Sequence, residues 1–259
     1  MTTKMRGLVA TVLALAVLLS AGCSGKKDDS TPGGGQDEKP AFSLASRQFV
    51  EESTKNQQEA EGKYLGKKVE LSGTVVGMGS GLLGPWVELE GHKDTRRQMC
   101  LFAEETPWKW CSPGQTVKLI GRCEKQPIFE GLVLARCKVL DATGPASPTL
   151  TATELARSYK KDPKETMSKY GGEATAPSGS KYQRIIILTG EIEKIEPHEG
   201  SVKLWFKTGD MAPRVYSTFE VGSAKAARES AKVGGTVKVT GKLQEEKGDI
   251  GISFGFLFE

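Results

Sequence analysis

Histidine is almost absent from this chain of 259 residues, which contains only His92 and His198. Two histidines leave almost no material for a histidine-rich metal site or for a catalytic triad. The sequence also lacks a G-x-S-x-G, an H-E-x-x-H, a P-loop and a C-x-x-C motif. We therefore expect a protein that is not an enzyme and that holds no metal ion and no cofactor.

The chain has no strong excess of either charge. It contains 36 basic and 32 acidic residues, a formal net charge of +4. Residues 41–143 hold 14 basic and 13 acidic residues, and residues 150–259 hold 17 and 15. A nucleic-acid-binding domain normally shows a clear cationic footprint. The charge balance therefore disfavours nucleic acid as a partner.

The N-terminal apolar run is too short to cross a bilayer. It extends from Leu8 to Leu19, is interrupted only by Thr11, and follows the basic residues Lys4 and Arg6. A membrane-spanning helix needs about 20 apolar residues, whereas this length is typical of a secretory signal peptide. The sequence therefore predicts export from the cytoplasm.

The end of this run, LLSAGC over residues 18–23, resembles the lipobox of bacterial lipoproteins. The resemblance implies removal of residues 1–22 and acylation of Cys23, with palmitate as one acyl group, so that the membrane is a partner. Several acyl chains give stable anchoring, whereas one alone binds only marginally. An ordinary signal peptide that ends near a cysteine is the alternative. Ser24 in place of an aspartate favours the outer membrane.

The remainder of the chain contains an internal repeat. Residues 114–122 read GQTVKLIGR, and residues 234–242 read GGTVKVTGK. Phe102 lies 29 residues after Gly73, and Phe219 lies 29 residues after Gly190. Equal spacing together with a shared nine-residue pattern indicates two copies of one module.

Each copy has the periodicity of short strands, because residues such as Val69 and Leu71 alternate with polar residues. A helical pattern opens each copy, over residues 44–64 in the first and from a Thr151-x-x-Glu154 capping box in the second, with a break at Pro163. The fold class predicted is mainly β with added helices: two OB-like small antiparallel β-barrels in tandem, each preceded by an N-terminal helix. The expected segments are a signal peptide (1–22), a flexible tether (23–40), a first domain (41–143), a linker (144–149) and a second domain (150–259).

Residues 60–73, which read AEGKYLGKKVELSG, resemble the bacterial tRNA_anti-like OB-fold family, as do Cys100-x-Phe102 and the glycines of residues 114–122. The resemblance covers nearly all of the first copy. The second copy keeps Lys169-Tyr170-Gly171 and the glycine pattern but lacks the cysteines. The family name reflects a fold relationship to anticodon-binding domains, so the resemblance implies a fold rather than an activity.

Four cysteines follow Cys23, and all lie in the first copy: Cys100, Cys111, Cys123 and Cys137. An even number in an exported chain is typical of disulfides, and three pairings are possible. The third and fifth strands of an OB barrel are neighbours, so the fold implies that Cys100 lies near Cys137, which leaves Cys111 with Cys123. A zinc site and free buried thiols are the alternatives.

Four residues are candidates for ligand binding. Trp108 and Trp110 lie in the connection after the expected third strand, where they would stack on a sugar ring or a base, rest on a membrane surface, or plug one end of the barrel. Arg96 and Arg97 would complete a basic groove. A glycine pattern over residues 79–84 matches G-x-G-x-x-G, but an expected strand follows it, so we interpret it as a flexible loop rather than a dinucleotide site.

These observations favour a membrane-anchored, non-enzymatic binding or scaffold lipoprotein of the cell envelope, facing the periplasm. OB barrels hold oligosaccharides and oligonucleotides on one face, and export favours an envelope protein, peptide or glycan as the partner. Two alternatives remain. One is a single-stranded nucleic-acid-binding OB protein, and the other is an envelope hydrolase whose carboxylates converge from distant positions.

Overall fold

The computed structural model describes residues 39–81, 83–92, 97–103, 107–127, 129, 131–198, 200–210, 213–219 and 231–258. Lys39–Glu259 forms one compact unit. The predicted signal peptide, Cys23 and nearly all of the predicted tether lie outside the described residues. Within the described part of the chain, no helix is long and apolar enough to cross a membrane.

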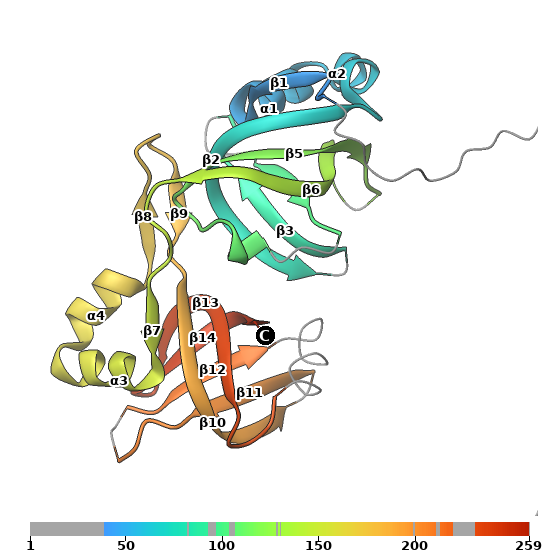
Figure 1. Cartoon of the computed structure of the whole chain (residues 1–259). Coiled ribbons are helices and arrows are strands. Elements are labelled where there is room, and N and C mark those ends of the chain that lie inside the picture. Colours follow the sequence, from blue (N-terminus) through green and yellow to red (C-terminus); the bar gives the residue numbers. More distant parts are fainter. Residues whose placement is uncertain are drawn as a thin grey trace, which may run out of the picture. The chain divides into compact units, whose positions relative to one another are not determined.

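Residues 41–143, called the first module, contain one six-stranded sheet with its own hydrophobic core. The strands pair in the order β1-β2-β3-β4-β6-β5, and β2 also pairs with β5 (Figure 1). The five strands from β2 to β6 therefore form a closed circuit of pairings. The elements are β1 (Phe42–Ala45), α1 (Ser46–Lys55), α2 (Gln57–Tyr64), β2 (Lys68–Gly81), β3 (Gly84–Leu89), β4 (Gln98–Leu101), the 3-10 helix η1 (Pro107–Lys109), β5 (Thr116–Lys125) and β6 (Leu132–Thr143).

Residues 150–259, called the second module, repeat this arrangement around a separate core. Their sheet has the order β11-β12-β14-β13-β10-β7, and β10 also pairs with β11. A small hairpin, β8–β9, is an addition without a counterpart in the first sheet. The elements are β7 (Thr149–Thr151), α3 (Ala152–Lys161), α4 (Pro163–Tyr170), β8 (Glu173–Thr175), β9 (Lys181–Gln183), β10 (Ile186–His198), β11 (Ser201–Phe206), β12 (Val215–Phe219), β13 (Thr236–Glu246) and β14 (Asp249–Phe258).

The predicted fold class is confirmed: the chain is mainly β, and its two large sheets are consistent with tandem OB-like modules. In each sheet a short N-terminal strand, β1 or β7, runs parallel to the first long strand. The sequence pattern did not indicate these two strands, because three or four residues are too few to show a period. The domain boundaries themselves stay a prediction.

The opening helix of the first module is broken, whereas the sequence pattern suggested one helix over residues 44–64. Asn56 adopts an extended backbone, and its side chain accepts a hydrogen bond from the backbone N–H of Glu59. It therefore caps α2 and ends α1. In the second module the predicted features are confirmed: Thr151 and Glu154 form a capping box, and Pro163 stands at the first position of α4.

Glu52 joins the two helices of the first module. Its carboxylate accepts hydrogen bonds from the Lys63 ammonium, at 2.7 Å, and from the Tyr64 hydroxyl. Hydrogen bonds from Lys63, Tyr64 and Gln48 lower the pKa of Glu52 to about 2. Ionised Glu52 therefore holds α1 against α2.

Acidification should weaken this junction. A carboxyl group whose pKa is lowered by folding contributes stability that is fully present above its unfolded pKa of about 4.5 and is lost as the pH falls toward about 2. Urea denaturation of the first module should show a decrease in the free energy of unfolding across this interval. The Glu52→Gln variant should start less stable at neutral pH and show a shallower decrease. An equal decrease in both proteins would contradict this role of Glu52.

Candidate functional site

Strands β3 and β4 form a face of the first module that points away from its core. Val87 and Cys100 are paired, fully buried residues that point inward. Side chains alternate along a strand, so Trp86, Glu88 and Met99 lie on the outer face. These strands are second and third in the circuit, the positions that carry the ligand face of OB folds.

Two glycines of β2 make room on this face. A Cβ at Gly79 would lie 2.3 Å from Cζ2 of Trp86, and a Cβ at Gly77 would lie 2.7 Å from Oε2 of Glu88. Such distances are sterically forbidden, so the Trp86 and Glu88 side chains lie across the bare backbone of β2. The alternating glycines therefore give the face a shallow floor.

The glycine pattern over residues 79–84 is part of this hairpin. β2 continues through Gly81, and β3 begins at Gly84. The interpretation of these residues as a flexible loop was therefore wrong, because most of them belong to paired strands. The strand after Gly84 confirms that this pattern does not open a helix, which a dinucleotide site would need.

Glu88 and Arg97 form an ion pair in the middle of the face. Their side chains lie 2.8 Å apart, and that of Arg97 is 51% exposed. The pair offers hydrogen-bond donors and acceptors together while adding no net charge. A ligand on this face would therefore meet a neutral polar group beside the indole of Trp86.

Two hollows meet at this ion pair. A cavity of about 340 Å³ lies on the Trp86 side, and its lining includes Gly79, Trp86, Glu88, Arg97, Gln183 and Lys242. An open groove of about 710 Å³ lies on the Met99 side, and its lining includes Ser53, Glu88, Arg97, Met99, Lys125 and Phe129. Because both hollows include Glu88 and Arg97, they form a continuous track across the face, long enough for more than one ligand unit.

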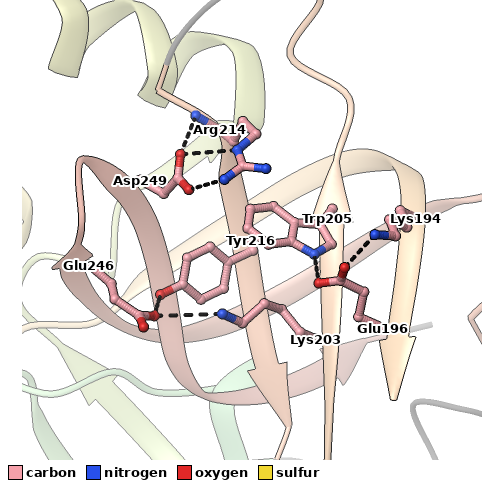
Figure 2. A network of polar contacts seen from close by, with 8 residues as sticks. All are labelled: Lys194, Glu196, Lys203, Trp205, Arg214, Tyr216, Glu246 and Asp249. Atoms are coloured by element: carbon pink, nitrogen blue, oxygen red, sulfur yellow. Dashed lines mark hydrogen bonds and ion pairs between the residues drawn. The ribbon is translucent and has the colours of Figure 1, made fainter. Parts of the chain in front are cut away.

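The second module carries a different arrangement at the equivalent positions (Figure 2). Trp205 and Arg214 lie 15 and 24 residues after Gly190, as Glu88 and Arg97 lie after Gly73. The Arg214 guanidinium stands 4.6 Å from the centre of the Trp205 ring system. An arginine over an aromatic ring thus replaces the carboxylate–arginine pair of the first module.

Carboxylates bind the cations of this second face. Arg214 binds Asp249 at 2.6 Å, and Lys203 lies 3.6 Å from Glu246. The Tyr216 ring lies beneath Lys203, 4.0 Å from its ammonium, and the tyrosine is 1% exposed (Figure 2). The aromatic rings of the second module are therefore covered by their own neighbours, whereas Trp86 borders a cavity.

The predicted ligand-binding residues do not gather at one place. Arg97 lies on the outer face of the first module, whereas Arg96 lies outside the described residues. Trp108 belongs to η1, and its side chain is likewise outside the description. Trp110 is 61% exposed but lines neither of the two hollows. Sequence reasoning missed Trp86 and Glu88; the signal for them was the glycine pattern of the paired strand.

The predicted disulfides are absent, because Cys100, Cys111, Cys123 and Cys137 are free buried thiols. β4 and β6 are neighbours as expected, but Cys100 pairs with Leu134 rather than with Cys137. Cys123 also pairs with Leu134, from β5. Cys111 is instead placed by η1, where its thiol lies 3.4 Å from the Pro107 carbonyl oxygen. Neighbouring strands alone do not give the close Cβ approach that a disulfide requires.

Burial raises the pKa of Cys111 and of Cys123 to about 12, so neither is a ready thiolate. Among the described residues, no cluster of three or more His, Cys, Asp or Glu side chains is arranged to hold a metal ion.

A family model described as tRNA_anti-like matches residues 1–139, which is more than half of the 259 residues. The chain belongs to the tRNA_anti-like family. The matched segment includes the whole face formed by Trp86, Glu88, Arg97 and Met99. No curated protein matches this tRNA_anti-like chain.

Solved structures share only a distant likeness with this tRNA_anti-like protein. One is a lipoprotein of Klebsiella pneumoniae subsp. pneumoniae MGH 78578, described provisionally as nucleic acid-binding, with 12% identity over 44% of this chain and 92% of that chain and a TM-score of 0.35. Another is a murine DNA-binding protein bound with double-stranded DNA, with 12% identity over 73% of this chain and 97% of that chain and a TM-score of 0.30. Likenesses this low carry no information about the ligand.

Proposed function

We propose that this protein is a non-enzymatic binding lipoprotein of the cell envelope whose first module holds an uncharged oligosaccharide. In this proposal acylated Cys23 anchors the chain to the membrane, and the face formed by Trp86, Glu88, Arg97 and Met99 binds the ligand. The observation that carries the proposal is the position of Trp86, which lies over Gly79 at the edge of a cavity of about 340 Å³.

The chemistry of the face suits a sugar. The apolar C–H face of a pyranose ring packs well on an indole, which is large, rigid and amphipathic. Sugar hydroxyls both donate and accept hydrogen bonds, and the Glu88–Arg97 pair provides acceptors and donors side by side. The open groove beyond this pair leaves room for further sugar units.

Charge argues for a neutral ligand rather than a nucleic acid. Binding of a phosphate backbone depends on cations that replace condensed counterions. Arg97 is paired with Glu88, and Lys125, at the far groove, is paired with Glu61 at 2.8 Å. A phosphate chain on this track would therefore lie beside carboxylates. The same pairing leaves Glu88 held by a cation, which does not suit a general acid.

Removal of the indole should weaken ligand binding strongly. Stacking on an aromatic side chain contributes about 1–3 kcal/mol, so Trp86→Ala should raise the Kd for a tetramer of β-1,4-linked N-acetylglucosamine about 5- to 150-fold. Isothermal titration calorimetry of the purified chain measures this change. Trp110→Ala removes an exposed tryptophan away from both hollows and should leave the Kd unchanged.

Arg97 and Arg214 provide a matched pair of variants, because they occupy equivalent positions in the two modules. Arg97→Ala should weaken binding of the same tetramer, whereas Arg214→Ala should not. Equal effects of the two substitutions would contradict a site on the first module. Tight binding of a twelve-residue oligothymidylate that weakens as salt is raised would instead support the nucleic-acid alternative.

A further inference from the structure

The β8–β9 hairpin is a separate two-stranded sheet. Its strands pair in register from Glu173 with Gln183 to Thr175 with Lys181. Within the described residues it joins neither six-stranded sheet. An isolated hairpin with strands of three residues is at best marginally stable in water. Contacts outside the hairpin must therefore supply most of its stability.

The turn of the hairpin contacts the first module through polar side chains. Thr74 donates a hydrogen bond to the Ser178 hydroxyl at 2.9 Å, and the Ser180 hydroxyl donates to Glu90 at 2.8 Å. Arg47 donates to the Ser178 carbonyl and to the Ser180 hydroxyl, both at 3.0 Å. Ser180 and Thr74 are 5% and 2% exposed. The contact is therefore buried and specific.

Glu90 is the charged centre of this contact. Its side chain is 11% exposed and lies 3.1 Å from Arg47. Burial alone raises the pKa of Glu90, but hydrogen bonds from Ser178 and Ser180 and the charge of Arg47 outweigh it, so the pKa lies below the ordinary value. A buried carboxylate needs such partners, and the hairpin provides two of them.

A second contact lies on the hairpin strand itself. The Tyr182 ring lies against Gly114, where a Cβ would be 2.6 Å from Cζ of the tyrosine. Gly114 also has a φ of +90°, a conformation that side chains with a Cβ rarely adopt. The repeat glycine of the first module thus receives an aromatic ring from the second.

The hairpin also forms part of the walls around the ligand face. Gln183 lines the cavity that contains Trp86. Ser180 and Lys181 line a neighbouring hollow of about 230 Å³, together with Glu90 and Arg97. The residues that attach the hairpin are therefore adjacent to the residues that border the cavity.

We propose that the β8–β9 hairpin is a strap from the second module, attached at Glu90, whose docking completes the wall of the ligand cavity on the first module. The attachment stands on the contacts alone. Its coupling to ligand binding rests on the proposed function. In this arrangement the second module contributes to the site through Gln183 rather than through its own outer face.

Hydrogen exchange of the full chain, in detergent and without ligand, tests the attachment. Glu90→Gln and Arg47→Ala should each speed exchange in peptides over residues 173–183 by about tenfold or more, because an undocked hairpin frays. Exchange in β2 and β10 should not change. Glu70→Gln alters a carboxylate of the first module that contacts Ser43 and Lys118 instead, and it should leave the hairpin unaffected. Unchanged hairpin exchange in both test variants would overturn the proposal.

The same measurement with the N-acetylglucosamine tetramer tests the coupling. Ligand should slow exchange over residues 173–183, and Gln183→Ala should raise the Kd without altering hairpin exchange in the free protein. Slower exchange in the hairpin would support the coupling. If the tetramer binds but exchange there is unchanged, the coupling is wrong. If the attachment variants behave as expected and no sugar binds, the proposed function fails while the strap remains.

Discussion

Replacement of Tyr216 by alanine should lower the free energy of unfolding of the second module by about 3–5 kcal/mol, the usual effect of removing a large buried aromatic side chain. Tyr216 is 1% exposed, and its ring packs at 5.0 Å from that of Trp205. The ring also lies over Gly251, where a Cβ would be 2.7 Å from Cζ of the tyrosine. The substitution would therefore leave a cavity between β11, β12 and β14, which urea denaturation would detect.

Tyr216→Phe is the control for this effect. It keeps the ring but removes the hydroxyl that donates to Glu246, so the loss should be about 1 kcal/mol. The two variants thus separate packing from hydrogen bonding. A loss of less than about 1 kcal/mol for Tyr216→Ala would show that the network in Figure 2 is a surface feature and does not brace the sheet.

Alanine at either repeat glycine should be the second large perturbation. Gly121 and Gly241 stand at equivalent places where the pairing of the last two strands shifts register. A Cβ at Gly241 would lie 2.5 Å from the Ser253 carbonyl oxygen, and one at Gly121 would lie 3.0 Å from the Ala135 carbonyl oxygen. The backbone must move in each case, so we expect losses of about 1–3 kcal/mol, with the larger loss for Gly241→Ala.

Gly62 provides the comparison for these glycines. It lies inside α2, and a Cβ there would meet nothing within 4 Å. Gly62→Ala should therefore stabilise the first module by about 0.5–1 kcal/mol, because alanine is the better helix former. Thermal denaturation of the three variants tests both signs. Wild-type stability in Gly121→Ala and Gly241→Ala would contradict the account of the repeat.

The repeat glycines also show what a sequence reveals about this fold. Their spacing and the alternation of strands such as β5 and β13 depend on local rules, so the two OB-like sheets could be predicted. Capping at Thr151 and Pro163 is local in the same sense. The break at Asn56 was missed, although asparagine is a good N-cap, because the helical spacing of apolar residues continues past it.

The candidate site depends on contacts between distant residues and was much harder to predict. Arg97 was a candidate because of its charge, but its partner Glu88 and the aromatic residue Trp86 became visible only through pairing with β2. Glu90 lies 90 residues from Ser180, and no short pattern connects them. The cysteines show the opposite error, since strand adjacency predicted disulfides that the side-chain positions do not form.

The central claim is that the outer face of the first module binds a neutral sugar chain, and calorimetry tests it most directly. The N-acetylglucosamine tetramer and the twelve-residue oligothymidylate should be titrated into the purified chain and into its Trp86→Ala variant at low and high salt. The account predicts sugar binding that is insensitive to salt and is weakened by Trp86→Ala, with no oligonucleotide binding. Oligonucleotide binding that falls with salt, or sugar binding that does not depend on Trp86, would contradict it.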